Sequence, residues 1–339
     1  MTYAVRLMDQ EESFEVHEGE SILDGALLAG VKLPHECTFG GCGTCKVKVH
    51  QGSVHYEDMP MALTEEEHRA GYALACQARC GESLIIEPCA LANDFAEPVT
   101  VTATVAVVER LAPDVMRLAL SIPDDLAALY VPGQYMNIVL PDGRTRSFSM
   151  ASAHKPGQPL EFHIKQIEHG YFTSDVLPSL VPGATLSIHF PLGTFAYREN
   201  DWRPMIMAAT GTGIAPIRAM LESLLDNEDC PPITLYWGVR SEADLYAAAE
   251  ISTWVHRLYE FQFIPVLSRA SDTWTGRRGY VQDAITDDHH DLSEHAFYLC
   301  GSPDMIEQAQ KAFVQRGADL EYIYSDSFTF SATQASALA

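Results

Sequence analysis

Six of the eight cysteines lie in the first 90 residues, and four of them are spaced like the ligands of an iron–sulfur cluster. Four residues separate Cys37 from Cys42, two separate Cys42 from Cys45, and Cys76 follows after thirty more. This C-x4-C-x2-C pattern with a distant fourth cysteine is typical of the plant-type [2Fe–2S] cluster. Three thiolates from one tight loop hold such a cluster from one side, and the fourth closes it. The pattern therefore predicts these four cysteines as iron ligands.

The glycines between these cysteines are suited to a backbone that wraps closely around a cluster. Gly40, Gly41 and Gly43 allow the amides to point at the sulfurs and tune the reduction potential. The alternative is a zinc site with four cysteine ligands. Zinc ribbons prefer two C-x2-C pairs, however, and this loop has one. The remaining early cysteines, Cys80 and Cys89, are interpreted as ordinary thiols.

Three other parts of the chain carry side chains suited to phosphates and flat rings. A guanidinium binds phosphate through paired hydrogen bonds, an aromatic ring stacks on a planar heterocycle, and a hydroxyl donates to or accepts from a ring nitrogen. A glycine-rich loop between a strand and a helix lets the backbone approach a pyrophosphate at the helix N-terminus. The sequences concerned are RSFS (146–149) with HIK (163–165) and GYFTS (170–174), then ATGTGIAP (209–216), then CGSPDM (300–305).

These motifs fall in three sections of a chain whose 339 residues exceed what one hydrophobic core usually holds. Residues 1–92 contain short strands and a helix capped at Ser21, ahead of the cysteine loop. Residues 99–200 are strand-rich with Pro-Gly turns, which predicts an antiparallel barrel. Residues 201–330 alternate apolar strands with helical stretches, one over 217–225, and predict a parallel doubly wound sheet. The polar stretch 91–98 is interpreted as a linker.

Charge and composition exclude several classes of function. The net charge is −24 at pH 7, so the chain is repelled by nucleic acid and by anionic membrane surfaces. We find no secretory signal and no apolar run of about 18 residues, and expect a cytoplasmic protein without a membrane span. Residues 1–95 carry 16 acidic against 6 basic side chains, which suits docking onto a basic protein partner.

Taken together, the motifs resemble those of the reductase components of bacterial aromatic-ring-hydroxylating, Rieske-type oxygenases. In that family a plant-type [2Fe–2S] ferredoxin domain is fused to a module similar to ferredoxin–NADP⁺ reductase. The resemblance covers nearly the whole chain and implies a multidomain protein. The protein is then expected to have an α+β (β-grasp) ferredoxin domain at 1–92, an antiparallel β-barrel flavin domain at 99–200 and an α/β nucleotide domain at 201–330. The N-terminal position of the ferredoxin domain implies FAD rather than FMN.

The resemblance also implies roles for individual residues. Arg146 pairs with the flavin pyrophosphate, Phe148 stacks on the isoalloxazine in place of the family's tyrosine, and Ser149 hydrogen-bonds near flavin N5. Cys300 lies where nicotinamide meets flavin and aids hydride alignment. The other cofactor-binding candidates are Ser147, His163, Ile164, Lys165, Gly170, Phe172 and Thr173 for the flavin, Gly211, Thr212, Gly213, Pro216, Gly238, Arg240 and Gly301 for the nucleotide, and Phe328 over the outer flavin face.

Several of these assignments have plainer alternatives. The strand carrying RSFS is an ordinary amphipathic strand if nothing binds there, and Cys300 is then a small buried hydrophobe. His163 and His169 are a metal or acid–base pair in another interpretation. Phe330 competes with Phe328, and core packing accounts for either one.

The nucleotide preference depends on few residues. Pro216 replaces the third glycine of the dehydrogenase fingerprint, which favours the reductase class. A carboxylate, Glu242 or Asp244, would bind the adenosine ribose and repel a 2′-phosphate, whereas Arg240 would attract one. We expect NADH.

Electron counting leads to the expected function. NADH gives up two electrons at once and a [2Fe–2S] cluster accepts one, whereas a flavin handles both. We expect a monomeric reductase that passes electrons from NADH through FAD and the cluster to a terminal aromatic-ring-hydroxylating dioxygenase or its ferredoxin. The same reductase serving a di-iron hydroxylase or a deoxysugar dehydrase is the alternative within enzymes. A zinc-bearing interaction module is the alternative outside them.

Overall fold

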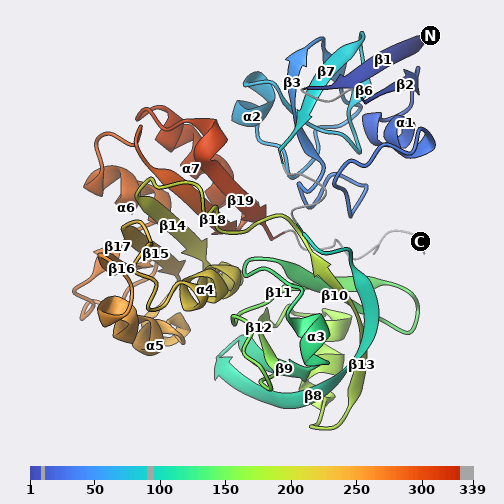
Figure 1. Cartoon of the computed structure of the whole chain (residues 1–339). Coiled ribbons are helices and arrows are strands. Elements are labelled where there is room, and N and C mark those ends of the chain that lie inside the picture. The colour runs from blue at the N-terminus through green and yellow to red at the C-terminus, as the bar shows by residue number, and fades with distance from the viewer. Residues whose placement is uncertain (9–11, 90–94, 329–339) are drawn as a thin grey trace.

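The computed structural model describes residues 1–8, 12–89 and 95–328, which form three lobes (Figure 1). The first part of the predicted linker, residues 91–94, and Phe330 lie outside the described residues. None of the described helices is long and apolar enough to cross a bilayer.

The first lobe is a mixed five-stranded sheet with a helix packed on it, the β-grasp arrangement. Its elements are β1 (Thr2–Leu7), β2 (Ser13–His17), α1 (Ile22–Leu28), β3 (Lys46–Gln51), β4 (Val54–His55), α2 (Glu65–Arg69), β5 (Tyr72–Leu74), β6 (Arg79–Cys80) and β7 (Leu84–Pro88). The order is β2-β1-β7-β3-β5, with β1 and β7 parallel and the other pairs antiparallel. A capping box between Ser21 and Asp24 starts α1, as the sequence indicated.

The second lobe is a six-stranded antiparallel barrel. Its elements are β8 (Val99–Ala112), β9 (Val115–Ser121), α3 (Asp124–Ala127), β10 (Tyr135–Val139), β11 (Thr145–Ser149), β12 (Leu160–Lys165) and β13 (Thr185–Leu192). The strand order is β11-β10-β13-β8-β9-β12, and a bridge between Met150 and Phe162 joins its two ends. After Gly170 the chain makes a single π-helical turn, Tyr171–Val176, rather than the ordinary helix expected from the sequence.

The third lobe is a six-stranded parallel sheet with helices on both faces. Its elements are β14 (Met205–Thr210), α4 (Ile214–Ser223), β15 (Ile233–Val239), α5 (Ala248–Thr253), β16 (Phe261–Leu267), β17 (Arg277–Arg278), α6 (Val281–Asp288), β18 (Ala296–Gly301), α7 (Pro303–Val314) and β19 (Ile323–Ser327). The order is β17-β16-β15-β14-β18-β19. The central strands β14, β15 and β18 are largely buried on both faces, which is why they are mostly apolar.

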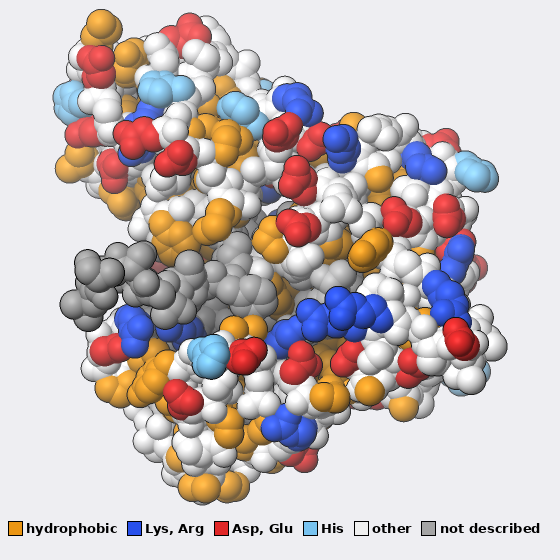
Figure 2. Space-filling model, turned by 180° about the vertical axis from the view of Figure 1, so that it is seen from behind, with side chains coloured by type: hydrophobic (Ala, Val, Ile, Leu, Met, Phe, Trp, Pro, Cys, Tyr) orange, Lys and Arg blue, Asp and Glu red, His pale blue; other side chains and the backbone are white. Residues whose placement is uncertain are grey.

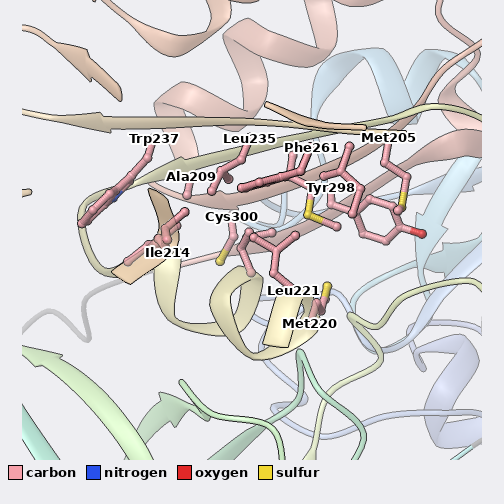
Figure 3. Close-up of a cluster of buried hydrophobic side chains, with 14 of the residues drawn as sticks. Met205, Ala209, Ile214, Met220, Leu221, Leu235, Trp237, Phe261, Tyr298 and Cys300 are labelled. Carbon is pink, nitrogen blue, oxygen red and sulfur yellow. The ribbon is translucent and has the colours of Figure 1, made fainter. Parts of the chain in front are cut away.

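Two cores, one on each face, hold this sheet together. Figure 3 shows the core under α4, where Trp237, Tyr298 and Cys300 pack among apolar side chains. The core under α6 and α7 is built on the alternate strand positions. Helix α4 starts at Ile214 and not at residue 217 as predicted, because Pro216 fits the first turn, where its missing N–H leaves no bond unmade.

Candidate functional site

The four predicted ligand cysteines meet at one end of the first lobe. Cys37 and Cys42 lie in the irregular loop between α1 and β3, Cys45 directly precedes β3, and Cys76 follows β5. Their sulfurs form two hydrogen-bonded pairs, Cys37 with Cys42 and Cys45 with Cys76. Cys45 and Cys76 are buried, whereas the other two keep some exposure.

Backbone amides surround these sulfurs. The Gly41 N–H donates to Cys37 Sγ at 3.2 Å. Hydrogen bonding from the Cys42 thiol, and then from loop amides, lowers the pKa of Cys37 to about 5, although burial opposes this. Gly40 has a φ of +78°, and a Cβ there would lie 2.6 Å from Pro60 Cβ, so only glycine fits. A loop that presents N–H groups to thiolates suits an anionic cluster.

The donor set fits two irons better than one ion. Among the residues the structure describes, no group of three or more His, Cys, Asp or Glu side chains is placed to hold a single metal ion. Two pairs of thiols match a [2Fe–2S] cluster, which takes four cysteine ligands shared between two irons. A tetrahedral zinc site would instead require four thiolates around one centre.

Strand β11 carries the first group of flavin candidates. Arg146 and Phe148 share one strand face, and Ser147 and Ser149 share the other. Arg146 is partly exposed, and its guanidinium donates to the Thr145 carbonyl at 2.7 Å. The Phe148 ring lies 5.5 Å from that of Phe172. Ser149 is buried opposite Tyr135 of β10, whereas Ser147 donates to Asn137.

Strand β12 and the following turn carry the second group. Ile164 is fully buried, and Lys165 pairs with Asp114 at 3.4 Å. Gly170 packs against the Thr173 hydroxyl, which accepts the Ile167 N–H at 3.1 Å. These contacts shape the loop itself.

His163 is buried, and its Nδ1 has no hydrogen-bond partner. Burial first, and then the positive Arg218 and Arg117, lower the pKa of His163 to about 3, so the ring is neutral at pH 7. His169 is 91% exposed, and within the described residues the two histidines form no metal-binding group. The His163 ring lies 5.2 Å from that of Tyr246 in the third lobe, whereas the Arg146 guanidinium and the Phe148 ring on β11 are groups that fit a planar, phosphate-bearing cofactor.

The nucleotide candidates meet at the carboxyl ends of β14 and β18, where parallel sheets usually bind ligands. A tight turn, Gly211–Gly213 with Thr212 at its centre, leads directly into α4, and Pro216 lies in the helix's first turn. A Cβ on Gly213 would lie 2.3 Å from the Cys300 carbonyl oxygen, and one on Gly301 2.1 Å from Thr210 Oγ1. Glycine at these two positions lets the end of β18 pack directly against the turn that leads into α4.

Cys300 is completely buried. Burial, and then the charge of Asp326, raise the pKa of its thiol well above the usual value. A neutral thiol is a poor nucleophile, so Cys300 acts here through packing and not through bond formation.

The residues considered for nucleotide preference lie at the end of β15. Gly238 packs against Val281, and Arg240 is exposed. Asp244 accepts the Ser241 N–H and hydroxyl at 2.9 Å, and Glu242 accepts the Ser271 hydroxyl. Asp244 is therefore held within its own loop, and Glu242 is hydrogen-bonded to the segment that follows β16.

Sequence reasoning missed a cavity of about 380 Å³ where all three lobes meet. Its wall includes Cys42 from the cluster loop, Tyr135 and Gly193 from the barrel, and Asp326 from β19. Asp326 stands opposite Cys300 in the sheet register. No local pattern marks Asp326, because only the fold brings it to this place.

Phe328 ends the described chain beside this region. Its N–H donates to the Gly301 carbonyl at 2.7 Å, and its ring packs against the core that contains Cys300. The contact ties the end of β19 to the nucleotide loop.

Asp326 is expected to make stability depend on pH. Burial first, and then the negative Glu36, raise the pKa of Asp326 to about 7, above the value of about 3.9 in an unfolded chain. A raised pKa favours the folded state below about pH 4, and this advantage is lost as pH rises through 7. We expect Asp326→Asn, which stays neutral, to melt close to the parent protein near pH 4 and increasingly above it as pH rises to 8 in thermal unfolding. Equal melting temperatures at pH 8 would contradict this.

Three domain families match the chain in the order of its lobes. They are the 2Fe-2S iron-sulfur cluster binding domain over residues 5–81, the oxidoreductase FAD-binding domain over 102–197 and the oxidoreductase NAD-binding domain over 207–311. Fold, site and domain families together define an oxidoreductase that uses a [2Fe–2S] cluster, FAD and a nicotinamide nucleotide.

Whole-length relatives narrow this class. The electron transfer component of xylene/toluene monooxygenase from Pseudomonas putida is 33% identical over 96% of this chain and 93% of its own. Reductase component 1 of terephthalate 1,2-dioxygenase from Comamonas sp. is 31% identical over 98% and 99%. A CDP-6-deoxy-L-threo-D-glycero-4-hexulose-3-dehydrase reductase from Yersinia pestis is 29% identical over 97% and 99%.

A solved structure matches the whole chain as well. The crystal structure of an Amycolatopsis cytochrome P450 reductase has a TM-score of 0.71 and 31% identity, covering 97% of this chain and all of that one. The chain belongs to the family of ferredoxin-fused flavoprotein reductases that includes the electron-transfer components of bacterial oxygenases. This confirms the function class, the three cofactors and the fold expected from the sequence.

Proposed function

We propose that this reductase takes electrons from NADH and delivers them to a terminal aromatic-ring-hydroxylating dioxygenase or to that enzyme's ferredoxin. The observation that supports the route most strongly is the cavity shared by Cys42, Tyr135 and Asp326, which joins the cluster loop, the flavin strands and the nucleotide sheet. When bound, FAD supplies the exchange between the paired electrons of NADH and the single electrons of the cluster. The chain's own residues supply distance, orientation and charge.

We assign the parts of the chain accordingly. The proposed domains are residues 1–92 for the cluster, 99–200 for FAD and 201–330 for the nucleotide. Cys37, Cys42, Cys45 and Cys76 would ligate iron. Arg146 would bind the flavin diphosphate, with Phe148 and Ser149 against its ring system. The turn Gly211–Gly213, with Gly301, would hold the nucleotide pyrophosphate, and Cys300 would align the nicotinamide.

The partner proposal relies on charge and on relatives. Several acidic side chains are scattered over the visible face of the first lobe, at the upper left of Figure 2, among hydrophobic and His side chains, and a basic partner surface would complement them. The terephthalate relative is named as a dioxygenase reductase. The second candidate for the electron-accepting partner is a monooxygenase or a deoxysugar dehydrase, which the names of the other relatives support. Reconstitution with purified terminal oxygenases would separate them.

Three further properties belong to the proposal. None of the eight cysteines, all of which lie within the described residues, forms a disulfide, which suits a cytoplasmic protein. The acidic surface opposes nucleic-acid binding. We propose a monomer that prefers NADH, because the Ser271 hydroxyl lowers the pKa of Glu242, which stays a charged carboxylate that would repel a 2′-phosphate near the exposed Arg240.

An anaerobic titration with NADH tests the route. We expect the purified protein to show flavin bands with a broad red-brown shoulder, and one to two equivalents of NADH to bleach both, since hydride donation supplies two electrons. NADPH at the same concentration serves as the comparison. A protein whose flavin bleaches while its cluster bands persist lacks the proposed route. Bleaching by NADPH alone would reverse the nucleotide assignment.

A further inference from the structure

We infer that Glu36 is a positioning residue that docks the cluster loop onto the flavin barrel. It stands directly before the ligand Cys37 and reaches across to the second lobe. The inference rests on the electron route proposed above, because its effect is on the transfer between flavin and cluster.

Both oxygens of the Glu36 carboxylate are occupied. Oε1 accepts the backbone N–H of Gly193, and Oε2 accepts the phenol of Tyr135. Oε2 also accepts the hydroxyl of Thr44, from the cluster loop itself, at 3.3 Å. Among the residues that the structure describes, no cation pairs with this carboxylate. A carboxylate removed from water needs such donors, and two of the three belong to another lobe.

The receiving site on the barrel is shaped for this contact. Gly193 follows β13 with a φ of +90°, and a Cβ there would lie 2.9 Å from the Tyr135 ring. Glycine therefore lets Tyr135 and the Gly193 amide stand side by side and face one carboxylate. Sequence separation hides the arrangement, because Glu36 is 99 residues from Tyr135 and 157 from Gly193.

The dock joins the two proposed redox sites through a short series of contacts. At one end Glu36 is bonded to Cys37. At the other, Tyr135 is the register partner of Ser149 in β11, the serine assigned to the flavin ring. Cys42 and Thr44 line the same cavity as Tyr135 and Gly193. A loose dock would lengthen or randomise the gap between the sites, and electron transfer slows as the gap between donor and acceptor widens.

A second contact limits rotation about the dock. Thr64 Oγ1 donates to the Gln310 side chain at 2.6 Å, and Gln310 Nε2 donates to Glu67 at 3.1 Å. Gln310 of α7 is fully buried, and Glu67 is also held by Lys46 at 2.6 Å. The first lobe is thus hydrogen-bonded to both of the others, and of these two contacts that of Glu36 lies next to a cluster ligand, Cys37.

The test compares Glu36→Ala, Glu36→Gln and the control Glu57→Ala in the full-length holoenzyme. Glu57 is an exposed acid of the same lobe, so its removal changes the charge equally. Three quantities are measured: NADH-dependent reduction of cytochrome c through the cluster, NADH-dependent reduction of ferricyanide at the flavin, and hydrogen exchange of the segment containing Gly193.

We expect Glu36→Ala to lower the cytochrome c rate at least tenfold, to keep the ferricyanide rate within twofold and to speed exchange at Gly193. Glu36→Gln keeps an acceptor for Gly193 and should recover part of the rate. Glu57→Ala should match the parent. Iron content and the visible spectrum report whether each variant retains its cluster, and Tyr135→Phe breaks the dock from the barrel side if Glu36→Ala loses the cluster.

Three results would overturn the inference. They are unchanged exchange at Gly193, an unchanged cytochrome c rate despite faster exchange, and a parallel fall of both rates. Failure of NADH to reduce the cluster in the parent protein would instead reject the proposed route.

Discussion

Replacing Cys76 with serine is expected to lower the rate of cytochrome c reduction through the cluster at least 100-fold, while ferricyanide reduction at the flavin continues. Cys76 is the one proposed ligand from outside the loop, and it is buried beside Cys45. A serine hydroxyl is not deprotonated at neutral pH as a cluster thiolate is, so the fourth side of the cluster stays open. Iron content, flavin content and both rates would be measured on the same preparation.

Cys80→Ser is the matched control. Cys80 is buried in the same lobe, and burial raises the pKa of its thiol to about 11, so it is an ordinary protonated side chain. We expect this variant to keep its iron and both rates, with at most a modest loss of stability from a buried hydroxyl. Loss of the cluster in Cys80→Ser but not in Cys76→Ser would reject the ligand assignment.

Much of the site could be predicted because its chemistry is encoded locally. The loop ligands Cys37, Cys42 and Cys45 lie within nine residues, so their spacing alone sets the geometry that a cluster needs. Alternation of strands and helices likewise predicted a parallel sheet, and the tight turn Gly211–Gly213 lies where that topology puts ligands. In these cases one short segment carries the whole signal.

Features that depend on contacts between lobes left no such signal. Glu36 appears in the sequence as one acid among 46 Asp and Glu, and only the barrel reveals its partners. Asp326 acquires its raised pKa from burial and from Glu36, 290 positions away in the numbering. For Glu242 and Asp244 the local signal was present but incomplete. Their carboxylates are suitable for binding a ribose, but in the structure they accept hydrogen bonds from the Ser271 and Ser241 hydroxyls. Local type predicts what a side chain can do, and packing decides whether it is free to do so.

Gly213→Ala should separate nucleotide use from the rest of the electron route. Its Cβ would lie 2.3 Å from the Cys300 carbonyl oxygen, 2.6 Å from the carbonyl carbon and 2.9 Å from Gly301 Cα. These are backbone atoms of β18 and cannot rotate away, so the start of α4 and the end of β18 must separate. Overpacking of this kind costs about 1–3 kcal/mol. We expect the NADH-dependent ferricyanide rate to fall about 100-fold while dithionite still reduces flavin and cluster.

Gly143→Ala shows why this effect would be specific to the nucleotide loop. Gly143 lies in an exposed turn of the barrel with φ +83° and nothing within 4 Å of its added Cβ, so the methyl group causes backbone strain without a clash. Such left-handed strain costs about 1–2 kcal/mol, comparable to the overpacking at Gly213. If stability alone governed NADH use, both variants would lose the rate equally. Because Gly213 has an unstrained φ and touches Cys300, only its substitution should raise the KM for NADH and slow flavin reduction, and equal rates in the two variants would exclude the turn Gly211–Gly213 from nucleotide binding.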